Sequence, residues 1–107
     1  MHLHQALDAF LTHQRADGRA EKTVAIYAHD LREVFSTLAD APVETLTAPW
    51  LSARLSAPAI ILLPDGTPKS PATLNRGRAA VRAFCAWAHH DGWLPNNPAA
   101  DIHLQRA

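Results

Sequence analysis

The sequence of 107 residues contains one cysteine, Cys85, and has a formal net charge of zero, from ten basic and ten acidic residues. One cysteine excludes a disulfide within the chain and is typical of a reducing compartment. Zero net charge argues against binding to a polyanion by overall charge, so any such affinity must come from how the charges are distributed. No apolar run approaches a membrane span and no signal peptide opens the chain, which predicts a cytoplasmic protein without membrane contact.

Patterns that mark an active site are also missing. The sequence has no glycine-rich phosphate loop, no paired carboxylates and no nucleophile elbow. Seven histidines leave a small metal-dependent enzyme as one alternative, but His89 and His90 have no carboxylate or thiol at ligand spacing. The single tyrosine, Tyr27, lies on a predicted apolar face. We therefore expect no metal, no cofactor and no catalysis by this chain.

Periodic apolar residues dominate what is present, since 48% of the chain is hydrophobic and 19% is charged. This composition and length predict one folded domain over residues 1–107. Apolar residues recur at i, i+3, i+4 and i+7, which predicts an all-α protein. The expected helices cover residues 2–16, 21–39, 48–56 and 71–91.

Helix boundaries follow from capping residues and prolines. Thr47 is the expected N-cap of the third helix, and Ser70 is the expected N-cap of the fourth, which Gly92 ends. Residues 57–69 are expected to form a loop with at most a short extended piece, because their prolines oppose a regular strand ladder. Residues 99–104 are expected to form a last helical turn.

Two predicted helices carry basic and hydrogen-bonding side chains opposite their apolar faces. We call these two rows the basic stripes. The stripe of the second helix consists of Lys22, Ala25, His29 and Arg32, and that of the fourth consists of Asn75, Arg78, Arg82 and His89. Arginine pairs with guanine, asparagine pairs with adenine, and either binds phosphate. A solvated face is the alternative, and Glu33 beside the first stripe favours it.

The start of the fourth helix is a second candidate for phosphate contact. Lys69, Ser70 and Thr73 surround backbone N–H groups at the positive end of the helix dipole. Ordinary capping is the alternative interpretation, and both roles are compatible.

Four segments resemble the core-binding domain of tyrosine recombinases and phage integrases. The second helix matches the spacing Thr-x-x-x-Tyr-x-x-Asp-Leu-x-x-x-Phe through Thr23, Tyr27, Asp30, Leu31 and Phe35. The other matching segments are 7–11, 70–76 continuing through 81–84 to Trp87, and 92–94 leading to Asn97 and Pro98.

This resemblance implies a SAM-like bundle of four to five helices that forms one arm of a clamp around double-stranded DNA. It also implies that the catalytic residues lie in a second domain outside this chain, and that the partners are that domain and other recombinase protomers on DNA. The DNA contacts that it implies, together with the helix start above, are Lys22, Thr23, His29, Arg32, Lys69, Ser70, Thr73, Asn75, Arg76, Arg78 and Arg82.

Three positions depart from the family pattern. Ala20 replaces a common serine cap, so the second helix is expected to fray at its start, and Arg78 replaces a commonly apolar residue. The 57–69 segment is longer than usual and carries the apolar run 60–63, which could dock on the catalytic domain or on a neighbouring protomer. A helical protein-interaction module is accordingly the main alternative function.

Overall fold

The computed structural model describes residues 1–105, and these form helices, turns and two isolated β-bridges. The α-helices are α1 (Leu3–Ala16), α2 (Glu21–Phe35), α3 (Ala48–Leu55), α4 (Pro58–Ile61) and α5 (Pro71–His90), and the 3-10 turns are η1 (Ser36–Leu38) and η2 (Val43–Thr45). The prediction of an all-α fold is therefore confirmed.

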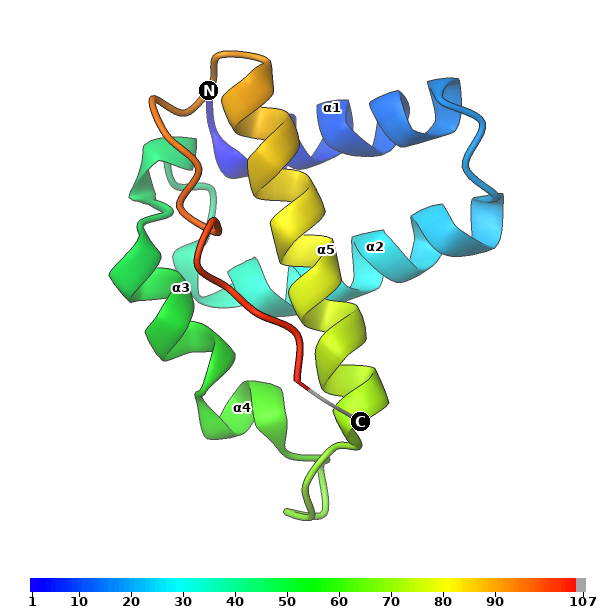
Figure 1. Ribbon diagram of the computed structural model, residues 1–107, viewed down its shortest axis with the longest axis vertical. Coiled ribbons are helices and arrows are strands. Elements are labelled where there is room, and N and C mark those ends of the chain that lie inside the picture. The colour runs from blue at the N-terminus through cyan, green and yellow to red at the C-terminus, as the bar shows by residue number, and fades with distance from the viewer. Residues whose placement is uncertain (106–107) are drawn as a thin grey trace.

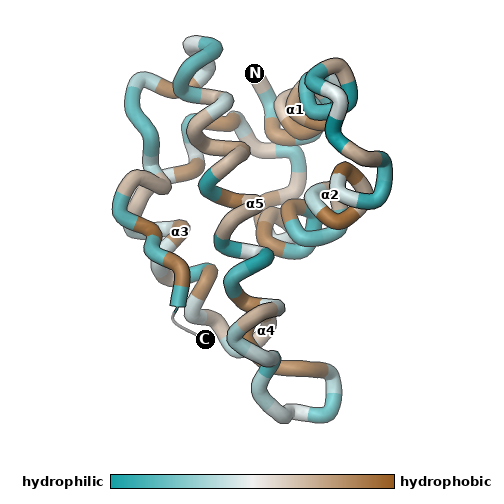
Figure 2. The backbone as a smooth tube through the Cα atoms, turned by 45° about the vertical axis from the view of Figure 1, so that its right-hand side comes forward, coloured by the Kyte–Doolittle hydropathy of each residue, from teal (hydrophilic) through white to brown (hydrophobic). Residues whose placement is uncertain are grey.

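The long helix α5 lies in the middle of the molecule. Figures 1 and 2 show α3 beside α5, and Figure 1 shows α1 and α2 crossing behind α5. The helices α1 and α2 form an antiparallel pair, which α5 crosses and packs against. This arrangement explains why the apolar faces of α1, α2 and α5 face one another in a single core.

Aromatic rings fill the centre of that core. Phe84 of α5 and Phe10 of α1 are fully buried, with ring centroids 5.5 Å apart in an edge-to-face arrangement. Trp87 contacts both rings, and Tyr27 of α2 lies 5.8 Å from Phe10. Edge-to-face and tilted arrangements are favoured by the quadrupole of the aromatic rings. They stabilise the core in addition to the stabilisation that comes from the buried apolar area.

Cys85 belongs to the same core. Its side chain is fully buried, and burial raises the pKa of the thiol to about 12. Because the thiolate is the reactive form of cysteine, the thiol is inert at neutral pH. Cys85 thus acts as a small hydrophobic residue, as the helical pattern indicates.

The predicted caps of α3 and α5 are present. The Thr47 hydroxyl accepts a hydrogen bond from the Trp50 amide at 3.2 Å, and the Ser70 hydroxyl accepts one from the Thr73 amide at 3.2 Å. At the other end of α5, Gly92 has a φ of +83°, a value that glycine adopts readily. Helix α2 begins at Glu21 as predicted, although Ala20 supplies no side-chain cap.

The second helix ends earlier than predicted. The expected range was 21–39, but α2 ends at Phe35 and is followed by η1. Arg54 of α3 donates hydrogen bonds to the carbonyls of Val34 and Glu33, each at 2.9 Å, and to the Ser36 hydroxyl at 3.2 Å. A distant arginine therefore satisfies the last carbonyls of the helix, and its positive charge faces the negative end of the dipole.

Replacing Arg54 with alanine is expected to lower the free energy of unfolding by about 1–3 kcal/mol, because carbonyls at the end of α2 lose charged hydrogen-bond donors. Urea denaturation measures the change as a lower midpoint at constant slope. Arg19→Ala is the matched control, since Arg19 is exposed in the turn before α2. Equal midpoints for the two variants would contradict a capping role for Arg54.

The prediction of a loop over residues 57–69 is wrong in part. Helix α4 occupies Pro58–Ile61, and an antiparallel bridge joins Leu62 to Pro68 around the turn at Asp65 and Gly66. Ala57 precedes a proline, and such a proline suits the first turn of a helix. The prolines limit the hairpin to one bridge, as expected.

The apolar run within this segment has two environments. Ile60 is buried in the core, whereas Leu63 is 44% exposed on the short hairpin, which projects from one end of the molecule (Figure 1). Ile60 is therefore a core residue. The prediction that the apolar run docks on another domain or protomer stays a prediction and now applies to Leu63.

The chain after α5 also differs from prediction. Hydrogen-bonded turns cover residues 98–101, and residues 102–105 continue without helical structure, so 99–104 form no helical turn. Asn97 accepts a hydrogen bond from the Ala99 amide at 2.9 Å, which holds the chain in a turn at this point. No helix within residues 1–105 is long and apolar enough to cross a membrane.

Candidate nucleic-acid interface

The crossing of α2 and α5 brings part of the predicted site together. A cleft of about 290 Å³ lies between these helices and the α4 segment, over an apolar floor that includes Val34 and Ile60. Five of the predicted residues line this cleft, namely His29, Lys69, Thr73, Arg76 and Arg78. His29 belongs to α2, and the other four belong to α5 or to the segment just before it.

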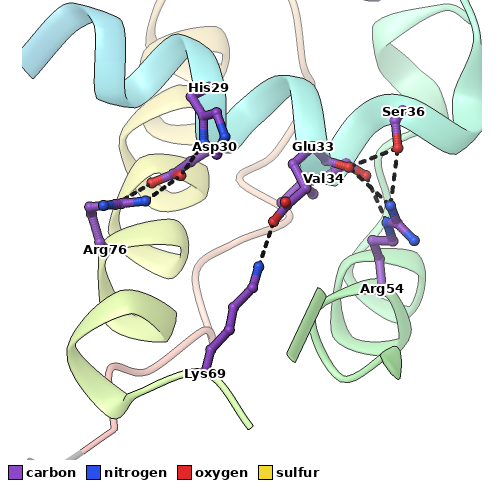
Figure 3. A network of polar contacts seen from close by, with 8 residues as sticks. All are labelled: His29, Asp30, Glu33, Val34, Ser36, Arg54, Lys69 and Arg76. Carbon is purple, nitrogen blue, oxygen red and sulfur yellow. Dashed lines mark hydrogen bonds and ion pairs between the residues drawn. The ribbon is translucent and has the colours of Figure 1, made fainter. Parts of the chain in front are cut away.

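Arg76 is held by a buried carboxylate. Its Nε lies 2.9 Å from Oδ2 of Asp30, and its second guanidinium nitrogen lies 3.0 Å from Oδ1, so the two side chains form a bidentate pair between α5 and α2 (Figure 3). The Asp30 side chain is 7% exposed and that of Arg76 is 45% exposed. The hydrogen bonds to Asp30 raise the pKa of Arg76 above its ordinary value. Arg76 therefore links two helices, whatever else it contacts.

His29 meets the same carboxylate from the outside. Its Nδ1 lies 3.1 Å from Oδ1 of Asp30 (Figure 3), while most of the imidazole is exposed. Asp30 thus contacts one predicted residue on its own helix and one on α5.

Lys69 is neutralised in a similar way. Its ammonium lies 2.9 Å from Oε1 of Glu33 (Figure 3), and its side chain is only 14% exposed. Glu33, which the sequence places beside the stripe of α2, therefore pairs with Lys69 and not with a residue of that stripe. Lys69 and Arg76 contribute little net positive charge to the surface.

Asn75 and Arg78 contact the end of the described chain. The Asn75 amide exchanges two hydrogen bonds with the backbone of Gln105, and Arg78 lies 3.4 Å from the carbonyl oxygen of His103. The fourth-helix stripe is thus partly covered by the protein itself.

Three predicted cations have exposed side chains and form no ion pair within residues 1–105. They are Lys22, Arg32 and Arg82. Arg32 lies beside Leu3 and Leu7 of α1, so the structure does not bring it to α5. Thr23 is half-buried and Ser70 is engaged in capping, with its hydroxyl 3.0 Å from that of Thr73.

Sequence reasoning missed the roles of Asp30, Glu33 and Arg54. The sequence did contain a signal for Asp30, because this charged residue lies outside the basic stripe of its helix. A charged residue on the buried side of a helix indicates an oppositely charged partner. The partners of the other two lie 36 and at least 18 residues away, and no local pattern reveals them.

The histidines do not gather into a metal site in the part of the chain that the structure describes. No group of three His, Cys, Asp or Glu side chains in residues 1–105 is placed to hold a metal ion. His4 and His13 each lie near one aspartate, Asp40 and Asp17 respectively, at 3.7 Å.

Comparison with known proteins identifies relatives along most of the chain. Residues 7–92 match the model of the phage integrase N-terminal SAM-like domain. The chain is 37% identical over 92 residues to tyrosine recombinase XerC of Mycobacterium bovis (strain BCG / Pasteur 1173P2), which covers 84% of this chain and 29% of the relative. No solved structure matches the chain.

Two further relatives have the same name. Tyrosine recombinase XerC of Mycobacterium sp. (strain JLS) is 35% identical over 106 residues, covering 95% of this chain and 33% of the relative. The protein of that name from Neisseria meningitidis (serogroup C, strain FAM18) is 33% identical over 96 residues, covering 89% and 32%. The chain thus spans about a third of the length of these curated relatives. Because the family model matches most of the chain, the protein belongs to the family of phage integrase N-terminal SAM-like domains.

Proposed function

We propose that the chain binds double-stranded DNA as the N-terminal clamp arm of a site-specific tyrosine recombinase, and that it contacts the core recombination site. The observation that carries the proposal is the crossing of α2 and α5, which gathers His29, Thr73 and Arg78 around one cleft. Membership of the family supports it further. A catalytic domain outside this chain and other protomers on DNA would be its partners, and the chain itself would bind without catalysing.

The contacts fall into two classes on this proposal. Lys22, Arg32 and Arg82 are exposed cations suited to phosphate, which fixes position rather than sequence. Asn75 and Arg78 are half-buried on α5, and their side chains are of the types that pair with adenine and guanine edges in the major groove. Arg76 and Lys69 act chiefly through Asp30 and Glu33, by holding α5 against α2.

Fluorescence anisotropy with a labelled duplex tests this function. The chain is expected to bind the duplex. The logarithm of the association constant should fall linearly with the logarithm of the salt concentration, with a slope of about −0.9 for each phosphate neutralised. The double variant Arg78→Ala/Arg82→Ala is expected to bind at least tenfold more weakly with a shallower slope, since charged contacts contribute about 1.5–3 kcal/mol each.

The matched control removes two arginines from another part of the surface. Arg15→Ala/Arg19→Ala changes the net charge equally at the α1–α2 turn, and it should retain most of the affinity. Equal losses in the two double variants would contradict an interface on α5. Absence of binding at low salt would favour the protein-interaction module, for which Leu63 and Trp93 supply exposed apolar surface.

A further inference from the structure

Residues 102–105 lie against the α5 face that is proposed to meet DNA. In Figure 1 this segment, drawn in red, runs between α3 and α5. Ile102 packs against the core, and Ile102 and His103 line a pocket together with Ser52 of α3 and Arg78 of α5. The segment therefore has a defined seat on the domain, and we call residues 102–105 the strap.

The strap binds Asn75 through both halves of its amide. Nδ2 of Asn75 donates to the carbonyl oxygen of Gln105 at 2.6 Å, and the backbone N–H of Gln105 donates to Oδ1 of Asn75 at 2.6 Å. Asparagine uses the same donor and acceptor when it reads adenine, whose N7 accepts and whose N6 amino group donates. The backbone of Gln105 thus presents to Asn75 the hydrogen-bond pattern of an adenine edge.

Arg78 is engaged by the same segment. Its guanidinium lies 3.4 Å from the carbonyl oxygen of His103. Asp101, just before the strap, lines the same pocket as Arg78 and brings a negative charge to it. The His103 carbonyl thus accepts a hydrogen bond that a guanine or a phosphate would accept from Arg78 in a complex.

We propose that the strap occupies the α5 face in the absence of DNA and leaves it when DNA binds, so that the chain and DNA compete for Asn75 and Arg78. This inference rests on the proposed function. The apparent affinity for DNA is then the intrinsic affinity multiplied by the fraction of molecules whose strap is displaced. Weakening the strap should therefore strengthen DNA binding, although no residue that touches DNA has changed.

Gln105→Pro tests the competition because proline has no N–H to donate to Asn75 Oδ1. Gln105→Ala is the matched control, since it shortens the side chain and keeps the N–H and the carbonyl. In the anisotropy titration, Gln105→Pro is expected to bind DNA about two- to tenfold more tightly than Gln105→Ala, which corresponds to the loss of one hydrogen bond. A chain that ends after Ile102 should gain at least as much while retaining the packing of Ile102 against the core.

Each outcome has a distinct meaning. Tighter binding by Gln105→Pro and by the shortened chain, with unchanged circular dichroism, supports the strap. Equal or weaker binding by both, compared with Gln105→Ala, overturns the competition while leaving DNA binding itself intact. Absence of binding by all variants at low salt, the shortened chain included, contradicts the proposed function and the competition with it.

Discussion

Phe84→Ala is expected to lower the free energy of unfolding by about 3–5 kcal/mol, the typical result of truncating a buried phenylalanine. The Phe84 ring is fully buried and contacts three other rings, with centroid distances of 5.5 Å to Phe10, 5.3 Å to Phe35 and 6.0 Å to Trp87. These rings belong to α1, α2 and α5, so the cavity would open where the three helices meet. Domains of this size have about 5–15 kcal/mol of total stability, so the variant would lose a large fraction of it.

Thermal and urea denaturation followed by circular dichroism would measure this change. Phe84→Leu is the matched control, since it keeps most of the volume and is expected to cost less than about half as much. A loss below about 1 kcal/mol for the alanine variant would show that the surrounding helices collapse into the space, contrary to the rigid aromatic centre described above.

Arg76→Ala is expected to lower the free energy of unfolding by about 2–4 kcal/mol, because it leaves the carboxylate of Asp30 buried without its bidentate partner. His29 contacts one oxygen of that carboxylate and is mostly exposed, so it compensates only in part. The cost arises from the unpaired charge rather than from the net strength of the ion pair, which is small for many buried pairs.

A double-mutant cycle separates these two contributions. Replacing both residues, as Arg76→Ala/Asp30→Leu, removes the buried charge together with its partner and should recover most of the stability lost in Arg76→Ala. If the double variant is as unstable as the sum of the single ones, the pair is not coupled and the explanation fails. The DNA affinity of an Arg76 variant should be compared with that of the unaltered chain at a temperature where the variant and the unaltered chain are both folded.

The helices could be predicted from the sequence because their information is local. Thr47 and Ser70 mark two helix starts within three residues of the amides that they cap. The end of α2 was not predictable in this way, because Arg54 lies about 20 residues from the carbonyls that it caps. Helix α4 has only four residues, too few for a hydrophobic period to appear.

The candidate site was predictable as a set of side chains but not as a set of contacts. The helical periodicity of α5 places Asn75, Arg78 and Arg82 opposite its apolar face. The same periodicity gives no information about which other segments of the chain contact these side chains. The partners of Arg76 and Asn75 are 46 and 30 residues away. Only tertiary packing brings Asp30 and Gln105 to α5, where they become partners of Arg76 and Asn75.

The inert thiol of Cys85 makes this chain suitable for site-specific labelling. Since Cys85 is the single cysteine and is fully buried, a cysteine introduced at an exposed position would be the reactive one toward maleimide dyes near neutral pH. Donor and acceptor dyes, one at Glu21→Cys and one on a duplex end, would then report by energy transfer how far the start of α2 lies from that end. The native core would need no alteration for such measurements.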